Sequence, residues 1–246
     1  MALVTGASSG IGEATALALA AQGAAVAVAA RRRDRLEGLA KRIEGDGGRV
    51  LVCETDVTEE RQAIAAVDDT VDQLGRLDIV VNNAGLMLLG PIVGADTAEW
   101  RRMVELNVLG LMYVTAAALP HLLRAAESEP RRVSDLVNVS SVAGRVARLN
   151  TGAYNATKWA VNAFSESLRQ EVTTRYVRVT LVEPGAVATE LAGHNRPEIL
   201  EGIQAMFGNI DRLESEDISD AIAYAVTRPR HVALNEVLVR PTEQER

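Results

Sequence analysis

The sequence predicts one α/β domain in which helices cover both faces of a doubly wound, Rossmann-type parallel sheet of about seven strands. Short apolar runs without polar alternation recur along the chain, which is typical of strands buried on both faces. Segments with helical patterning separate these runs. No linker-like stretch divides the 246 residues, so we expect a single domain, residues 1–246.

The expected strands and helices alternate from the start of the chain. The strands are apolar runs that end at turn-forming residues, and they occupy residues 2–5, 25–30, 50–53, 77–81, 136–139, 177–182 and 237–239. Helical segments occupy residues 13–22, 34–44, 58–74, 96–126, 152–174 and 216–226. Pro120 is expected to kink the fourth helix because proline lacks a backbone N–H. Residues 191–206 contain Gly and Pro, and we expect them to be irregular or weakly helical.

Charge and cysteine content narrow the class of protein. The formal net charge is −7 and no basic stripe occurs, which argues against a nucleic-acid partner. The one cysteine, Cys53, permits no internal disulfide, which suits a reducing cytoplasm, and we expect it to be buried. No apolar run is expected to reach the ~18 residues of a membrane helix, and the N-terminus lacks the features of a signal peptide. We therefore expect a soluble, cytoplasmic protein without a membrane partner.

A glycine-rich loop, Thr5-Gly6-Ala7-Ser8-Ser9-Gly10-Ile11-Gly12, joins the first strand to the first helix. Backbone amides at such a helix N-terminus form an anion site, and the glycines let the backbone approach a pyrophosphate. Its spacing is G-x-x-x-G-x-G rather than the commoner G-x-G-x-x-G. The alternative is a tight turn without a ligand. The predicted cofactor contacts here are Gly6, Ser8, Ser9, Gly10, Ile11 and Gly12.

Two arginines at the end of the second strand indicate which dinucleotide is used. NAD sites usually carry an acidic residue there, whereas NADP sites carry arginine for the 2′-phosphate. This strand ends in Arg31 and Arg32, with no carboxylate before Asp34. The guanidinium fork suits a phosphate. We predict NADP(H), with Arg31 as the main contact and Arg32 in support; the alternative is a solvated charge run.

Tyr154 and Lys158 are four residues apart on the fifth expected helix, so both side chains lie on one face. An ammonium group near a phenol favours the ionised phenolate. On its own this spacing occurs by chance in many proteins. Its context in the chain decides whether it is catalytic.

The motifs together resemble those of the short-chain dehydrogenase/reductase family. They are the glycine-rich loop, Asn82-Asn83-Ala84-Gly85, Asn107, Ser141, Tyr154-x-x-x-Lys158 and Pro184-Gly185, in the family's order over nearly the whole chain. The resemblance implies the strand order 3-2-1-4-5-6-7 and reversible hydride transfer between NAD(P) and an alcohol or carbonyl. The chain starts at the first strand, without the residues that usually precede it in the family, so we treat its true start as open.

The resemblance also implies roles for the catalytic residues. Tyr154 is the general acid/base, and Lys158 with the oxidised nicotinamide lowers its pKa and holds the nicotinamide ribose. Ser141 lies thirteen residues before Tyr154, the family's separation, so we assign it to the substrate oxygen and Ser140 to structure. Asn107 holds a water in a proton path from Lys158; the alternative is a satisfied polar residue at a helix bend.

The remaining cofactor contacts implied by the resemblance follow the third, fourth and sixth strands. Small residues after the fourth strand let the ribose approach the backbone, while the asparagines tie neighbouring strands. Thr189 could instead be a plain helix cap. These predicted contacts are Asp56, Val57, Asn83, Ala84, Gly85, Pro184, Gly185, Val187 and Thr189, together with Tyr154 and Lys158.

Fewer sequence features indicate the substrate than indicate the cofactor. The chain's C-terminal strand and the residues after the fourth strand resemble the subgroup of 3-hydroxy acid and clavulanic acid dehydrogenases. We therefore hypothesise an aldehyde or ketone with a nearby carboxylate, such as clavulanate aldehyde or a 3-oxo acid. Its anchor would be an arginine or histidine near a substrate lid around residues 186–210. The alternative is an apolar pocket formed by Met87, Leu88 and Val146. The candidate anchors are Arg145, Arg148, His194 and Arg196.

Two other functional classes use parts of the same motif set. A non-catalytic NADP-binding regulator would lose the active-site set, which is intact here. An epimerase or dehydratase usually needs a longer C-terminal substrate domain than the residues after Pro184 provide. His121 and His231 are expected at the surface or in packing, and no metal site is predicted. By resemblance we expect a homotetramer, or a homodimer, whose two long helices pack across subunits.

Overall fold

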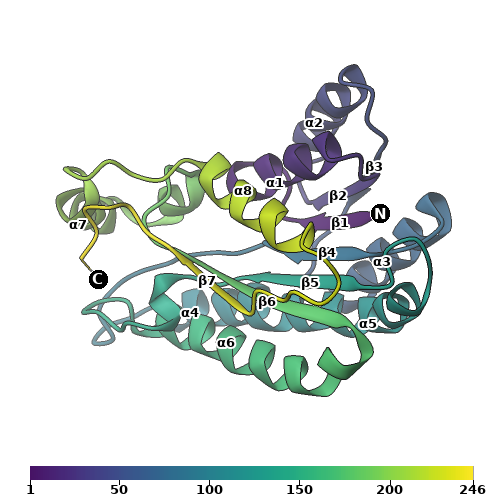
Figure 1. The fold of residues 1–246 in the computed structure, drawn as a ribbon. Coiled ribbons are helices and arrows are strands. Elements are labelled where there is room, and N and C mark those ends of the chain that lie inside the picture. Colours follow the sequence, from purple (N-terminus) through teal and green to yellow (C-terminus); the bar gives the residue numbers. More distant parts are fainter. Residues whose placement is uncertain (246) are drawn as a thin grey trace.

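Seven strands pair in parallel in one sheet with the order β3-β2-β1-β4-β5-β6-β7, as the sequence predicts (Figure 1). The computed structural model describes residues 1–245. The strands are β1 (Ala2–Thr5), β2 (Val26–Ala30), β3 (Val50–Glu54), β4 (Ile79–Asn82), β5 (Ser134–Val139), β6 (Val177–Pro184) and β7 (Glu236–Val239). The expected boundaries differ from these by a few residues at most, because ends of buried strands carry no sharp sequence signal.

Helices form a layer on each face of the sheet (Figure 1). On one face lie α1 (Gly10–Ala21), α2 (Arg33–Gly45) and α8 (Ser215–Val226). The other face carries α3 (Glu60–Leu74), α4 (Thr97–Val104), α5 (Leu111–Glu127) and α6 (Gly152–Val172). Successive residues of β1 point into opposite layers, since Leu3 belongs to the core beneath α3 and α5 and Val4 to the core beneath α1 and α8.

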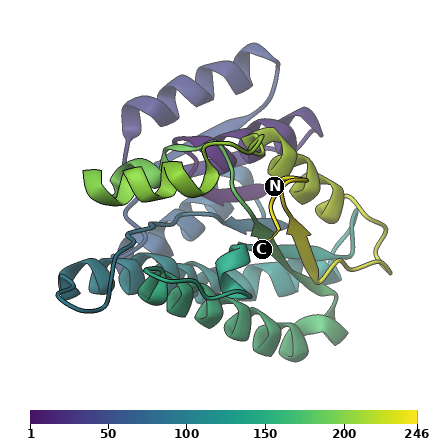
Figure 2. The same cartoon turned by 90° about the vertical axis from the view of Figure 1, so that its left-hand side faces the viewer.

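The carboxyl ends of the strands meet at one edge of the sheet, which faces the viewer in Figure 2. β1 pairs with both β2 and β4, so the crossover direction reverses between them. A crevice forms at such a switch point, outside the carboxyl ends of the strands. The loops that follow β1, β4, β5 and β6 therefore converge there.

The long helix expected over residues 96–126 is interrupted, and not at the expected place. A π-helical turn, η1 (Glu105–Gly110), separates α4 from α5, whereas Pro120 lies inside α5. π-Helical turns are frequent at functional sites, and Asn107 lies in this one. Sequence patterning could not show it because the apolar periodicity continues through the turn.

The expectation that no apolar stretch is long enough to cross a membrane was wrong for this same helix. The continuous helical stretch Thr97–Glu127 meets the length and composition of a membrane span. Val114, Ala118 and Leu122 of it are buried in the core beneath the sheet, however. Apolar helices of a protein core pass the same test, so this one has a structural reason for its composition.

Residues 186–210, which we call the lid segment, are more ordered than expected. They contain a 3₁₀-helix, η4 (Glu190–His194), and a helix, α7 (Pro197–Phe207). Pro197 stands in the first turn of α7, where its missing N–H costs nothing. Two glycines had favoured an irregular segment. Gly193 lies in η4, and Gly202 lies at an exposed position of α7.

Candidate active site

A cleft of about 690 Å³ runs along the carboxyl edge of the sheet. At one end it is lined by the glycine-rich loop, Arg31 and Arg32, and at the other by Tyr154 and Lys158. The lid segment forms one wall through Thr189, Leu191 and neighbouring residues. The structure thus brings the predicted motifs of the two chain halves into one cavity.

The glycine-rich loop packs directly on the residues after β4. Gly6 has φ +65°, and a Cβ there would lie 2.8 Å from Cα of Ala84. A Cβ on Gly12 would lie 2.4 Å from Nδ2 of Asn83. That same Nδ2 donates to the Thr5 carbonyl at 3.0 Å. Side chains at these glycines would therefore separate β1 from β4.

The asparagines tie strands together, as expected. Asn82 on β4 donates through Nδ2 to Oδ1 of Asn138 on β5 at 2.9 Å and to Oγ1 of Thr115 on α5 at 3.0 Å. Ala84 and Gly85 then line the cleft. These bonds fix where the chain leaves β4.

The N-terminus of α1 opens into the cleft without a side-chain cap. Its N-cap is Ser9, whose side chain makes no capping hydrogen bond. The Ser9 hydroxyl instead accepts from Nη2 of Arg32 at 2.7 Å. First-turn amides of a helix need partners, and with the helix dipole they favour an anion. The site therefore fits the pyrophosphate of a dinucleotide.

The arginines after β2 take different places. Arg32 lies over the loop, with Nε and Nη2 donating to the Ser8 hydroxyl at 3.1 and 3.0 Å. The Arg31 side chain is 73% exposed, with Asp56 3.8 Å away. Both line the cleft. Which of the two is the main phosphate contact stays a prediction. Arg32, predicted in the supporting role, is the one that bonds the serines of the loop.

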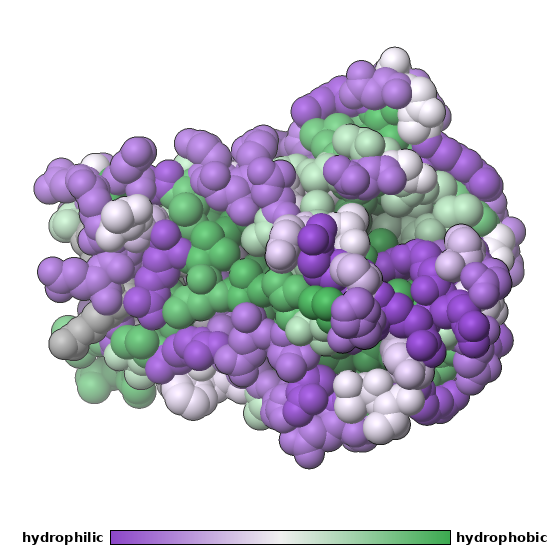
Figure 3. All heavy atoms as spheres, in the orientation of Figure 1, coloured by the Kyte–Doolittle hydropathy of each residue, from purple (hydrophilic) through white to green (hydrophobic). Residues whose placement is uncertain are grey.

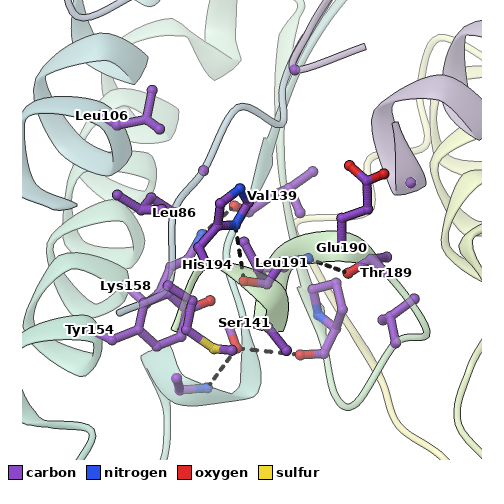
Figure 4. Close-up of a pocket in the computed structure, with 18 of the residues that line it drawn as sticks. Leu86, Leu106, Val139, Ser141, Tyr154, Lys158, Thr189, Glu190, Leu191 and His194 are labelled. Carbon is purple, nitrogen blue, oxygen red and sulfur yellow. Dashed lines mark hydrogen bonds between the residues drawn. The ribbon is translucent and has the colours of Figure 1, made fainter. Parts of the chain in front are cut away.

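Three of the predicted catalytic side chains gather at the other end of the cleft (Figure 4). Tyr154 and Lys158 extend from α6 and are buried, and Ser141 follows β5. Lys158 donates to the Val139 carbonyl at 3.0 Å. Both Ser140 and Ser141 line the cleft, but the Ser140 hydroxyl donates to Oδ1 of Asn162 at 2.6 Å. The geometry agrees with the choice of Ser141 over Ser140.

Burial, rather than the Tyr–Lys attraction, dominates the two pKa values. It raises the pKa of the Tyr154 phenol to about 12, opposed by a hydrogen bond from Ser141. It lowers the pKa of the Lys158 ammonium to about 8. Burial sets the direction of both shifts in the protein by itself. The prediction that Lys158 together with the oxidised nicotinamide lowers the phenol pKa stays a prediction.

Asn107 is buried in η1, and its side chain hydrogen-bonds the loop after β4. Its Oδ1 accepts from the Leu86 amide at 2.7 Å, and its Nδ2 donates to the Leu86 carbonyl at 2.8 Å and to Oγ1 of Thr157 at 3.1 Å. Asn107 thus holds η1, Leu86 and α6 together at the bend. The predicted water-holding role stays a prediction.

The other predicted cofactor contacts lie along the cleft between its ends. Thr189 caps η4 by accepting from the Leu191 amide at 3.4 Å, so its capping alternative is part of the structure. Asp56 accepts from the Thr58 amide at 3.1 Å. The cleft-lining residues of the set are Asp56, Val57, Asn83, Ala84, Gly85, Pro184, Gly185, Val187 and Thr189.

The candidate substrate anchors separate into two groups. Arg148 and His194 line the cleft. Arg145 instead donates through Nε to the buried Glu183 carboxylate at 2.6 Å and pairs with Glu236. Arg196 lies 3.6 Å from Glu198 on the lid segment. Arg145 is therefore a structural residue, not a substrate anchor.

The apolar part of the pocket also differs from the expected set. Met87 and Val146 line the cleft, with Leu86 and Leu89. Leu88 instead lies in a buried cluster with Met103 and Tyr154. His121 contacts Arg124 near the surface, and His231 is exposed, as expected.

Three polar residues that sequence reasoning missed organise the site. Asn195 of the lid segment accepts from the Leu89 amide at 2.7 Å and donates to the Met87 carbonyl at 2.9 Å. Glu183 is fully buried beside Ser141's loop, and Glu190 pairs with Arg32. A charged residue inside the apolar β6 run was the available signal for Glu183; nothing local distinguished the other two.

The model of the family described as short chain dehydrogenase matches residues 1–200. The chain belongs to the short-chain dehydrogenase family. Among residues 1–245, no group of His, Cys, Asp or Glu side chains could hold a metal ion.

Relatives and solved structures agree with this membership. The chain is 37% identical over 244 residues to the glycine betaine reductase ATRR of Emericella nidulans, and spans 19% of that protein. It is 35% identical to an uncharacterised oxidoreductase of Staphylococcus saprophyticus, covering 98% of this chain and 96% of that one. A serine dehydrogenase complexed with NADP⁺ superposes with TM-score 0.87 at 31% identity, covering 100% of this chain and 96% of that one. A 3-ketoacyl-ACP reductase from Sinorhizobium meliloti superposes with TM-score 0.85 at 35% identity, covering 97% and 96%.

Proposed function

We propose that this oxidoreductase transfers a hydride reversibly between NADP(H) and a carbonyl compound, giving an alcohol. One observation carries the proposal: Tyr154, Lys158 and Ser141 lie at the end of the same cleft that begins at the glycine-rich loop and the arginines. An anion site and a proton donor are thus joined by a continuous groove.

The residues of the chain fit the cofactor at each end. NADPH, when bound, supplies the hydride. The uncapped N-terminus of α1 would hold the pyrophosphate, and Arg31 and Arg32 the 2′-phosphate. The NADP⁺ complex of the related serine dehydrogenase supports this choice. We infer that Lys158 holds the nicotinamide ribose.

The raised pKa of Tyr154 suits it to donate a proton. At neutral pH a phenol with a pKa of about 12 is protonated, so it can protonate a carbonyl oxygen as reduction proceeds. The Ser141 hydroxyl beside it can hydrogen-bond the same oxygen. In the reverse direction Tyr154 must first lose its proton, and the positive charges of Lys158 and of the oxidised nicotinamide favour that loss.

The proposal is tested by the absorbance of NADPH with a panel of aldehydes and ketones. Turnover that Tyr154→Phe abolishes, while NADPH binding is retained, supports it. Binding without turnover on any carbonyl would favour the alternative, a non-catalytic NADP-binding regulator.

Cofactor preference is tested separately. We expect Arg31→Asp and Arg32→Asp each to lower the ratio of kcat/KM for NADPH over NADH, because each removes a positive charge from the cleft. An unchanged ratio in Arg31→Asp would remove Arg31 from the phosphate site and leave Arg32 as its main contact.

For the substrate, we propose a carbonyl compound that carries a carboxylate, such as a 3-oxo acid or clavulanate aldehyde. Arg148 and His194 both line the cleft, and we take Arg148 as the candidate anchor because a guanidinium fork suits a carboxylate. The related serine dehydrogenase acts on a carboxylate-bearing alcohol, which supports the class. A 3-oxo acid should react with a higher kcat/KM than its methyl ester, and Arg148→Gln should remove the difference.

We also propose a cytoplasmic homotetramer. Trp159 of α6 and Val104 of α4 are exposed although apolar, and the two helices lie side by side (Figure 1). A second apolar band crosses the middle of the face in Figure 3, over the edge strand β7, where Leu238 is exposed. Two separate apolar faces suit a tetramer. Light scattering gives the mass, and Trp159→Glu should halve it.

A further inference from the structure

Glu190 of the lid segment reaches the arginines of the predicted 2′-phosphate site. Its Oε2 accepts from Nη1 of Arg32 at 2.8 Å, and its Oε1 accepts from Nη1 of Arg35 at 2.7 Å. Figure 4 shows its carboxylate pointing away from Tyr154, Lys158 and Ser141. A carboxylate of the lid segment is thus bound at the predicted site of the 2′-phosphate.

Four of the five N–H donors of the Arg32 guanidinium are engaged in this arrangement, which leaves too few for a bidentate contact. Nε and Nη2 donate to the hydroxyls of Ser8 and Ser9, and Nη1 donates to Glu190. An arginine presents a fixed fork of five N–H donors. A phosphate bound bidentately by Arg32 would need donors that these oxygens already hold. Glu190 and a 2′-phosphate therefore require the same group.

Resting on the proposed NADP(H) function, we propose that Glu190 competes with the cofactor's 2′-phosphate for Arg32. Binding of the phosphate is thereby coupled to the position of the lid segment. A phosphate that takes Arg32 displaces the Glu190 carboxylate, by competition for N–H donors and by repulsion between two anions. A 2′-hydroxyl, which carries no charge, leaves the Glu190–Arg32 pair in place.

Displacement of Glu190 would shift the part of the lid segment that lines the cleft, because Glu190 belongs to that part of the chain. Glu190 is the first residue of η4, directly after the cap Thr189. Leu191 and His194 of the same short helix line the cleft. A change of partner at Glu190 therefore changes how η4 is held. Arg35, which does not need to leave Glu190, limits how far the segment moves.

Protonation does not relieve the competition near neutral pH. The two arginines hold the pKa of the Glu190 carboxyl at about 2, so the group stays charged. All three side chains are about half exposed, and such pairs are individually weak. The competition is therefore strong enough to tune cofactor affinity and too weak to prevent binding.

The test compares two probes that differ only in the 2′-phosphate, adenosine 2′,5′-bisphosphate and 5′-AMP. Calorimetric titration gives the affinity of each for the wild-type protein, Glu190→Gln and Glu201→Gln. The last is the matched control, since Glu201 is an exposed acid of the same segment and loses the same charge. We expect Glu190→Gln to bind the bisphosphate about twofold to fivefold more tightly, with 5′-AMP and the Glu201→Gln variant nearly unchanged.

Two further readouts separate competition from a general charge effect. In an Arg32→Gln background the gain from Glu190→Gln should shrink to the part that repulsion between the two anions gives, because the contested donors are gone. In the wild type, the bisphosphate but not 5′-AMP should raise hydrogen exchange of the amides of η4, and Glu190→Gln should show that higher exchange without a probe.

The outcomes distinguish this inference from the proposed function. If the wild type binds the bisphosphate no better than 5′-AMP, the NADP preference fails and the inference with it. If it prefers the bisphosphate but Glu190→Gln leaves that affinity unchanged or weakens it, Glu190 is a bystander or a support for Arg32, and only the inference is overturned.

Discussion

The Lys158 ammonium lies 5.8 Å from the centroid of the Tyr154 ring and donates to the Val139 carbonyl at the end of β5. Lys158 is therefore tethered to the sheet rather than to the phenol. Burial acts on the two groups in opposite directions, raising the pKa of Tyr154 and lowering that of Lys158. Both shifts favour uncharged side chains, which leaves the phenol as a proton donor.

The first prediction concerns pH. Burial lowers the Lys158 pKa to about 8, so Lys158 is charged below pH 8 and neutral above it, while Tyr154 keeps its proton up to a pKa of about 12. We expect kcat/KM for carbonyl reduction to be flat below pH 8 and to fall above it, since this ratio reports groups of the free enzyme. A profile that stays flat to pH 10 would contradict a role for charged Lys158.

The adjacent serines provide a matched pair. Ser141→Ala should lower kcat for reduction by about a hundredfold to a thousandfold, because it removes a hydrogen bond to the substrate oxygen. It also removes the hydrogen bond that the Ser141 side chain accepts from the Ala143 amide, which should cost about 1 kcal/mol of unfolding free energy. Ser140→Ala removes the bond to Asn162 and should cost about 1–3 kcal/mol of unfolding free energy instead. Thermal unfolding and initial rates for both variants decide it. Equal effects on rate would mean that the serines are not divided between chemistry and structure.

A buried carboxylate supports the loop that carries Ser141. Glu183 on β6 is fully buried and accepts from Arg145 at 2.6 Å and from Asn162 at 2.8 Å. Glu183→Ala should cost about 3 kcal/mol, because it removes the buried partner of Asn162 and of the partly buried Arg145. Glu236→Gln removes the exposed partner of the same Arg145 and should cost about 1 kcal/mol or less. Urea unfolding measures both; similar costs would show that burial of Glu183 carries no weight.

Most of the fold could be predicted from the sequence because it rests on local patterns. Apolar runs marked the strands, and Gly6 and Gly12 marked the loop that packs on Ala84 and Asn83. A helix bend at Asn107 was one of the alternatives, but its partners Leu86 and Thr157 could not be predicted, since they lie far away in the chain.

The same distinction holds for the site. Residue types at fixed spacing located Tyr154, Lys158 and Ser141, because their geometry is set within one helix and one strand. The roles of the arginines depend on pairs between distant parts of the chain: Arg145 donates to Glu183, and Arg32 donates to Glu190. The raised pKa of Tyr154 in the protein by itself has a related origin, since burial comes from the whole fold and not from the neighbouring lysine.

The last prediction concerns Asn195, which ties the lid segment to the loop after β4. Its side chain is buried and bonds both the Leu89 amide and the Met87 carbonyl, so it holds the two walls of the substrate end together. Asn195→Ala should raise KM for the carbonyl substrate by about tenfold, the loss expected for one or two hydrogen bonds, while the affinity for adenosine 2′,5′-bisphosphate stays the same. Asn209→Ala, an exposed asparagine of the same segment, is the control. Steady-state kinetics at saturating NADPH measures the effect. If KM is unchanged in Asn195→Ala, these bonds stabilise the lid segment without shaping the substrate site.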